Sequence, residues 1–180
     1  MKLRDYLDAD WAQLYAFADQ AAPRRQFVSN FSPRFAPVFF IRLAQRAHEK
    51  GWGRIAKVPA LLNFVVFGIE VPVRLRIGPG LVIPHPVGTI LGAREIGRNV
   101  TIYQQVTLGA KLADFDYVPE LRPLICDGAI ITAGAKIIGP VRIGVNAIVG
   151  ANAVVLSDVP DDSIAMGVPA KVRSKAGQDQ

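Results

Sequence analysis

Cysteine and histidine are both scarce in this sequence of 180 residues, which contains one cysteine, Cys126, and two histidines, His48 and His85. A single cysteine cannot build an internal disulfide framework or a zinc site made of cysteines. A metal site of three histidines is excluded in the same way. We therefore expect no metal cofactor, and a chain suited to a reducing cytoplasm.

The sequence also lacks a long apolar run. The longest one, from Leu61 to Val73, is interrupted by Asn63, Glu70 and Pro72 and is too short to span a bilayer. The N-terminus, MKLRDYLDAD, has no apolar core of the kind found in secretory signals. These features predict a cytoplasmic protein that is soluble or bound peripherally to the inner face of the membrane.

Acidic residues are in the minority, with 15 Asp and Glu against 21 Lys and Arg and a net charge of +6. Such an excess favours an anionic partner, for example nucleic acid, anionic lipid or a phosphate-rich cofactor. The sequence contains no nucleic-acid reading motif and no stacking aromatics interleaved with the basic residues. We therefore expect no nucleic-acid partner.

Residues 1–68 are predicted to form a helical segment. The hydrophobic spacing indicates one helix around residues 11–18, a second from Pro37 to about Lys50, and a short apolar helix from Arg54 to Phe67. Asp8 and Asp10 are candidate caps for the first helix.

The same segment is strongly basic. Between residues 24 and 57 it has eight Lys and Arg residues against Glu49 alone. Such a segment could lie on an anionic membrane, or it could be a solvated helical face packed in an oligomer, and both interpretations stay open. The basic residues are Arg24, Arg25, Arg34, Arg42, Arg46, Lys50, Arg54 and Lys57, and the aromatic residues beside them are Phe39, Phe40 and Trp52.

From Ile77 onward, aliphatic residues recur at every sixth position. This period fits neither an α-helix nor the two-residue alternation of a strand. It is typical of a hexapeptide β-helix, in which three hexads close a triangular coil of about eighteen residues with the aliphatics stacked inside. We therefore predict a mainly β fold, with a parallel β-helix over residues 69–180. The repeated aliphatics are Ile77, Ile83, Ile96, Ile102, Leu108, Ile125, Ile131, Ile137, Ile143, Val149 and Val155.

One stretch breaks this repeat. Between Leu108 and Ile125, the residues GAKLADFDYVPELRPL fall out of the six-residue period. They are predicted to form a loop that bulges from the coil, and loops on rigid scaffolds often carry function.

Five strings of the repeat region carry a family resemblance: GIEVPVRLRIGPGLVIPHPVGTILGA, VTIYQQVTLGA, ITAGAKIIGPVRIG, VGANAVV and GVPAKV. With these strings, roughly residues 69–173 resemble the hexapeptide acyltransferases, and most closely their serine acetyltransferase branch. The resemblance implies a left-handed coil, against the usual right-handed crossover. It also implies an acetyl-CoA-dependent O-acetyltransferase that assembles as a homotrimer, with its active site between subunits.

The resemblance places His85 at the position of the family's catalytic histidine. A base with a pKa near neutrality is what the reaction needs, because the acceptor hydroxyl must lose a proton as it attacks the thioester. Glu70 stands where the family has an aspartate, 15 residues before His85. It is expected to orient the imidazole and to stabilise its protonated form. The alternatives are a corner residue held by local hydrogen bonds for His85 and a solvated residue for Glu70.

The resemblance also implies how coenzyme A is held. The pantetheine arm is expected to lie in a groove between coils, at the small residues Ala110, Ala133 and Ala151. Lys171 is expected to approach the phosphates. Arg173 and Lys175 could assist it. Cys126 follows a repeat aliphatic and is expected to be structural rather than an acyl-carrying nucleophile.

Two departures from the family bear on the acceptor. Pro84 replaces an aspartate and Arg122 replaces a second histidine, and these groups recognise the amino-acid acceptor in serine acetyltransferases. We therefore expect the acceptor hydroxyl to belong to a sugar of a polysaccharide or glycolipid precursor, with Arg122 as a candidate acceptor-binding residue. The alternatives are a serine O-acetyltransferase of cysteine biosynthesis, a xenobiotic acetyltransferase, and a non-catalytic hexapeptide scaffold.

Overall fold

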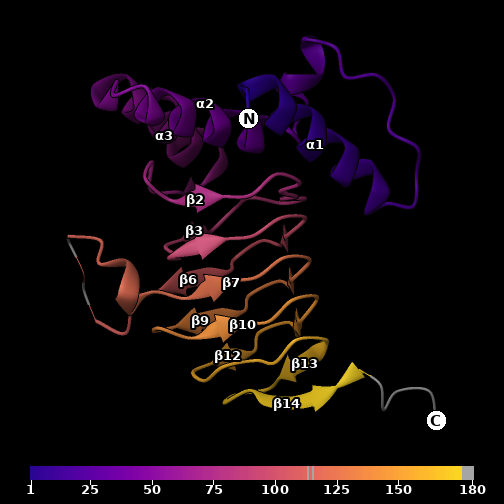
Figure 1. Cartoon of the computed structure of the whole chain (residues 1–180), viewed down its shortest axis with the longest axis vertical. Coiled ribbons are helices and arrows are strands. Elements are labelled where there is room, and N and C mark those ends of the chain that lie inside the picture. The colour runs from indigo at the N-terminus through magenta and orange to yellow at the C-terminus, as the bar shows by residue number, and fades with distance from the viewer. Residues whose placement is uncertain (113, 115, 176–180) are drawn as a thin grey trace.

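The computed structural model describes residues 1–112, 114 and 116–175. Its first part is helical and its second is a stack of coils (Figure 1). The helical part consists of α1 (Leu3–Ala16), the short 3₁₀ helix η1 (Val28–Phe31), α2 (Ala36–Glu49) and α3 (Gly53–Phe67). These helices lie across the N-terminal end of the stack, and α3 leads directly into the first strand (Figure 1).

Short strands form the three sides of each coil. One sheet has the strand order β1-β3-β6-β9-β12, the second β10-β7-β4-β2 and the third β14-β13-β11-β8-β5. Every pairing except β13 with β14 is parallel, and Arg142 pairs with Leu124, eighteen positions earlier. This arrangement is a parallel β-helix, and the predicted left-handed form is confirmed. The strands are β1 (Ile69–Glu70), β2 (Arg76–Ile77), β3 (Thr89–Leu91), β4 (Glu95–Ile96), β5 (Thr101–Ile102), β6 (Thr107–Gly109), β7 (Leu124–Ile125), β8 (Ile130–Ile131), β9 (Lys136–Ile138), β10 (Arg142–Ile143), β11 (Ile148–Val149), β12 (Val154–Val155), β13 (Ser163–Met166) and β14 (Lys171–Ser174).

The repeated aliphatics line the inside of the coil. Ile77 is 6% exposed, Val155 is 1% exposed, and the nine repeat aliphatics between them are fully buried. Each coil therefore buries its apolar side chains on those of the coils above and below it, which is the source of stability in a repeat fold.

The corners of the coil explain its glycine and asparagine pattern. Gly128 has a φ of 69° and Asn146, one coil later, has a φ of 54°. Gly and Asn are the residues that best tolerate this left-handed conformation. A Cβ on Gly128 would lie only 2.2 Å from Oδ1 of Asn146. The asparagine side chain therefore fits only because the residue beside it is a glycine.

The predicted loop protrudes from the stack without disturbing it (Figure 1). Lys136 pairs with Thr107, 29 positions earlier rather than eighteen, so eleven extra residues are accommodated between β6 and β7. The loop contains the 3₁₀ turn η2 (Pro119–Leu121). The strands on either side keep their pairing.

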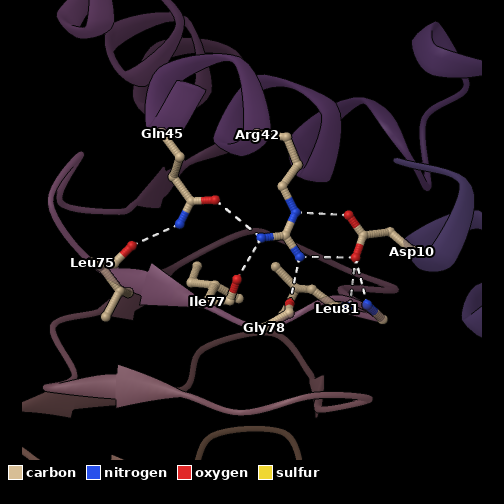
Figure 2. A network of polar contacts seen from close by, with 8 residues as sticks. Asp10, Arg42, Gln45, Leu75, Ile77, Gly78 and Leu81 are labelled. Carbon is tan, nitrogen blue, oxygen red and sulfur yellow. Dashed lines mark hydrogen bonds and ion pairs between the residues drawn. The ribbon is translucent and has the colours of Figure 1, made fainter. Parts of the chain in front are cut away.

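A buried ion pair fastens the helices to the first coil. Asp10 on α1 is 0% exposed and Arg42 on α2 is 2% exposed, and their side chains form two hydrogen bonds of 2.8 and 2.9 Å. Arg42 also donates to the carbonyl oxygens of Ile77 and Gly78, at 2.8 and 2.6 Å (Figure 2). The guanidinium thus lies between two helices and the start of the β-helix.

This ion pair corrects two expectations about the helical segment. Asp10 does not cap α1, because that helix begins at Leu3 and Asp10 lies within it. Its Oδ1 atom instead accepts hydrogen bonds from the backbone N–H groups of Gly80 and Leu81, both at 2.8 Å. Arg42 does not belong to an exposed basic face, because its charge is neutralised in the interior.

We predict that Asp10→Asn lowers the free energy of unfolding by about 3–5 kcal/mol, because it leaves the Arg42 guanidinium charged and buried without its partner. Urea denaturation would measure the loss. Glu49→Gln is the matched control, since it breaks the exposed Arg46–Glu49 pair at 2.9 Å and should cost less than about 1 kcal/mol. Equal losses in the two variants would contradict a dominant role for the buried pair.

Candidate active site

His85 lies on the outside of the coil, in the turn that leads into β3. The preceding Ile83 is fully buried, whereas His85 is exposed between the half-buried Pro84 and Pro86. The two prolines restrict the backbone on either side. The N–H of Thr89 closes the turn on the carbonyl oxygen of Pro86 at 3.3 Å. The local sequence therefore presents the imidazole to solvent from a constrained backbone.

Glu70 lies on the neighbouring coil. Strand β1 pairs with β3 so that Glu70 is opposite Ile90, and both side chains are exposed on the outer face of the sheet. Within the described part of the chain, no hydrogen bond or ion pair joins Glu70 to His85. The structure thus brings the two residues to adjacent coils, and their pairing as a dyad stays a prediction.

Three of the four residues expected to bind coenzyme A share one edge of the coil with His85. His85 precedes β3, Ala133 precedes β9 and Ala151 precedes β12, and all three strands are parallel members of one sheet. The N-terminal ends of parallel strands lie along the same edge. Consistent with this, Asn152 donates its N–H to the carbonyl oxygen of Ala133 at 2.9 Å.

Lys171 lies at the far end of this edge. It opens β14 and is paired with Met166, whose side chain packs beside Gly150, the residue before Ala151. Four coil steps of about 4.8 Å separate the His85 turn from this end, or about 19 Å in all. The edge therefore runs from an imidazole at one end to an exposed ammonium at the other.

Ala110 lies elsewhere. It follows the C-terminal end of β6, in the same sheet, and so lies at the opposite edge from Ala133 and Ala151. The adjoining Gly109 accepts a hydrogen bond from Gly139 at 2.8 Å along that second edge. Within one chain, Ala110 is therefore not brought together with the other predicted cofactor residues.

Arg122 anchors the base of the protruding loop. Its side chain is 10% exposed, and it contacts Asp114 Oδ2 at 2.9 and 3.0 Å through Nη2 and Nε. Nη1 donates to the carbonyl oxygen of Gly92 at 3.1 Å, and the guanidinium stacks 4.0 Å from the centre of the Tyr117 ring. Its donors are thus engaged within the chain, and its role in acceptor binding stays a prediction.

Asp114 and Tyr117 are two residues that sequence reasoning missed. Tyr117 donates its hydroxyl to the carbonyl oxygen of Ala93 at 2.5 Å, so the loop is held against the coil at two points. Burial of the ring raises the pKa of Tyr117 to about 12, although the cations of Arg122 and Arg74 act to lower it. No signal in the sequence points to them, because the burial of Arg122 that calls for a nearby carboxylate appears only in the structure.

The thiol of Cys126 does not take part in this edge. Burial raises its pKa above the ordinary value, although nearby Arg142 acts to lower it. A raised pKa reduces the thiolate fraction at neutral pH, so the group is a poor nucleophile there. The expectation that Cys126 is structural agrees with this environment.

Comparison with known proteins identifies the branch of the family. No family model matches the chain. A serine acetyltransferase of Helicobacter pylori strain J99 is 36% identical over 158 residues, which are 87% of this chain and 91% of that protein. The chain belongs to the serine acetyltransferase family. The predicted enzyme class, an O-acetyltransferase, is confirmed by this membership.

Solved structures agree with this assignment. A serine acetyltransferase in complex with CoA has a TM-score of 0.80 and 26% identity, over 95% of this chain and 69% of that one. The Neisseria gonorrhoeae serine acetyltransferase in complex with serine has a TM-score of 0.78 and 31% identity, over 94% of this chain and 68% of that one.

The expectation of a sugar acceptor is wrong. It rested on Pro84 and Arg122, two positions at which the chain departs from the family. The similarity to proteins named serine acetyltransferase extends over most of the chain and supports the serine alternative instead. Loss of individual polar contacts weakens one way of binding an acceptor, but it does not identify a different acceptor.

The pKa of Tyr117 leads to a pH prediction. Between pH 10, the ordinary tyrosine value, and about 12, the unfolded chain loses this proton while the folded chain keeps it. Folding stability should therefore fall as the pH rises through this window. Ultraviolet titration of the folded protein should show one of its four tyrosines ionising late. Tyr117→Phe should remove this late step, and a late step that persists in the variant would contradict the assignment.

Proposed function

We propose that this chain is a serine O-acetyltransferase of cysteine biosynthesis, which transfers the acetyl group of acetyl-CoA to the hydroxyl of L-serine. The observation that carries the proposal is the position of His85, exposed at one end of an edge that also holds Ala133, Ala151 and Lys171. Family membership supports serine as acceptor, and the related structure with CoA supports acetyl-CoA as co-substrate.

His85 is the general base of the proposed reaction. Its neutral imidazole takes the proton of the serine hydroxyl while that oxygen attacks the thioester carbonyl carbon. The tetrahedral intermediate then collapses, the carbon–sulfur bond breaks, and the departing thiolate takes a proton from the imidazolium. The products are O-acetylserine and free coenzyme A. No metal is needed for any of these steps.

Glu70 is the proposed partner of His85. A carboxylate beside the imidazole would fix its tautomer and stabilise the imidazolium that forms during the reaction. The pairing of β1 with β3 puts Glu70 on the coil next to the His85 turn. Both side chains are exposed in the single chain.

Coenzyme A is proposed to lie along the edge between His85 and Lys171. Its thioester would be at the His85 end, and its phosphates near the ammonium of Lys171. Arg173, two residues further along exposed β14, adds a second cation. Lys175 already donates to the carbonyl oxygen of Asn146, so it contributes less to this binding.

The active site is proposed to be completed in a homotrimer. Ala110 lies at the opposite edge of the sheet from Ala133 and Ala151, so one chain cannot bring all three to the same ligand. Coils packed side by side around a threefold axis would bring the His85 edge of one copy near the Ala110 edge of the next. Such packing would also exclude water from His85, which strengthens the electrostatic interactions of the reaction.

The proposal includes a cytoplasmic location with peripheral contact at an anionic membrane. Among the described residues, no helix is long and apolar enough to cross a bilayer. Dependence on acetyl-CoA supports a cytoplasmic enzyme, and the excess of basic residues supports contact with an anionic surface.

The acceptor can be tested by the release of free thiol from acetyl-CoA. With L-serine we expect thiol release that His85→Ala lowers by at least about a hundredfold, since general base catalysis typically contributes 10²–10⁴. Glu70→Gln should lower kcat with a smaller effect on the KM for serine. Unchanged activity in His85→Ala would refute the mechanism. If no thiol is released with serine but another acceptor gives release, the assignment of the substrate is refuted.

Binding of the phosphates can be tested at Lys171. Lys171→Gln should raise the KM for acetyl-CoA by about tenfold and leave kcat nearly unchanged, because one charge-assisted contact contributes about 1.4 kcal/mol. Arg98→Gln is the matched control, because Arg98 is also exposed and cationic but lies at another corner of the coil. Steady-state kinetics at two salt concentrations would separate the two variants. The same KM in both would contradict a role for Lys171.

A further inference from the structure

Helix α3 buries a small and a polar residue and exposes its large apolar side chains. Of its fifteen residues, the fully buried ones are Ala56 and Asn63, and the Asn63 side chain donates to the carbonyl oxygen of Pro37 at 2.9 Å. Its large apolar side chains face solvent instead, and they are between 42% and 70% exposed. They are Ile55, Val58, Leu61, Leu62, Phe64, Val65 and Val66.

These side chains form a continuous surface. Val58, Leu61, Leu62 and Val65 recur at intervals of three and four residues, which places them on one face of the helix. Proteins in solution rarely expose several large apolar side chains on one contiguous face unless that face meets a partner or a membrane. The face opposite to it packs on α2, so the arrangement is set by the fold.

The charges on helix α3 itself have one sign. Helix α3 contains Arg54 and Lys57 and no acidic residue, and Lys50 lies just before it with its ammonium 4.9 Å from the centre of the exposed Trp52 ring. In the described part of the chain, neither Arg54 nor Lys57 forms an ion pair. A hollow lined by Trp52, Arg54, Lys57 and Arg74 brings these cations together at the N-terminal end of the helix.

This charge pattern distinguishes between a second copy of the chain and a lipid bilayer as the partner of the apolar face. A second copy that docked through the same face would offer no carboxylate from its own α3 to pair with Arg54 and Lys57, because the helix contains none. An anionic bilayer would supply acyl chains to the apolar face and phosphates to the cations. Tryptophan is also favoured at the boundary between the two.

We propose that helix α3 lies flat on an anionic lipid bilayer, with its apolar face inserted at the headgroup boundary and Arg54 and Lys57 among the lipid phosphates. At about 1.5 Å per residue, a helix of 15 residues is about 22 Å long, shorter than the hydrocarbon core, so it rests on the membrane rather than crossing it. This identifies the surface for the membrane contact in the proposed function, and it does not depend on the acetyl acceptor.

The surface is only part of the segment expected from the sequence. That expectation covered the basic residues of 24–57 with Phe39, Phe40 and Trp52. Of these, Phe39 and Arg42 are buried on α2, whereas Trp52, Arg54 and Lys57 are exposed. Helix α3 lies at the helical end of the molecule, at the opposite end of the stack from the C-terminal coils (Figure 1). In an assembly of parallel coils, every copy would present α3 at the same end, and several weak contacts would then act together.

Sedimentation of the full-length protein with lipid vesicles tests the proposal. We expect binding to vesicles of phosphatidylcholine mixed with phosphatidylglycerol, weaker binding to phosphatidylcholine alone, and a decrease with added salt. Leu61→Gln with Val65→Gln should weaken binding by at least tenfold. The matched control is Leu112→Gln with Leu156→Gln, which replaces apolar side chains that are 84% and 51% exposed elsewhere and should leave binding unchanged.

The cations have their own pair of variants. Arg54→Gln with Lys57→Gln should reduce binding to the anionic vesicles and its salt dependence, whereas Arg94→Gln with Arg98→Gln should change neither. Circular dichroism and thiol release would be measured for every variant. If thiol release is unaltered while vesicle binding falls, the membrane surface is separated from the catalytic function, and failure of the enzyme assay alone leaves the membrane result intact.

Two outcomes would overturn the proposal. The first is that the native chain and the Leu61→Gln, Val65→Gln variant bind vesicles equally well, or that neither binds them. The other is a lower assembly mass of this variant in light scattering, together with no vesicle binding by the native protein. That second result would identify the α3 face as a contact between copies of the chain.

Discussion

The buried pair of Asp10 and Arg42 is the interaction on which the arrangement of the two parts of the chain depends. One guanidinium joins α1, α2 and the carbonyl oxygens of Ile77 and Gly78, while one carboxylate accepts the N–H groups of Gly80 and Leu81 (Figure 2). Charges in such an interior are tolerated only when their hydrogen bonds are complete, and here they are. The anchored segment leads within a few residues to His85. The contacts that hold the helices to the first coil therefore also hold the chain just before the candidate active site.

The repeat determines the geometry of the site. Each coil advances the chain by a fixed step, so residues with the same position in successive hexads form columns along an edge. Small residues that look like ordinary corners in the sequence become a continuous path when they are stacked. The eleven-residue insertion interrupts the sequence of the repeat but not its columns, which is why Ala133 and Ala151 remain aligned with the His85 turn beyond it.

The coil could be predicted from the sequence because its signal is local and repeated. Successive hexads carry an aliphatic residue (Ile, Leu or Val) at the same place, so an error at one position is corrected by the others. The helical segment offered no such redundancy. Nothing near Asp10 in the sequence indicates that its partners lie on α2 and in the first coil, and Arg42 looks like its exposed basic neighbours.

The exposed face of α3 was missed for a related reason, because an apolar helix is ordinarily assumed to turn its large residues inward. The acceptor was misjudged because the sequence shows that Pro84 and Arg122 differ from the family but not which contacts the new residues make. Arg122 is engaged with Asp114 and Tyr117, and this pairing is visible only in three dimensions.

The antiparallel strand β14 has a consequence for the solubility of the fold. A parallel coil could in principle continue indefinitely, since each turn offers the next one a row of free backbone donors and acceptors, much as the growing tip of a fibril does. Strand β14 folds back on β13 and covers one side of that last turn, while the helices cover the first coil at the other end. The two ends of the stack are therefore chemically unlike each other and unlike its middle. End-to-end addition is thus disfavoured along the side that β14 covers and at the coil that the helices cover.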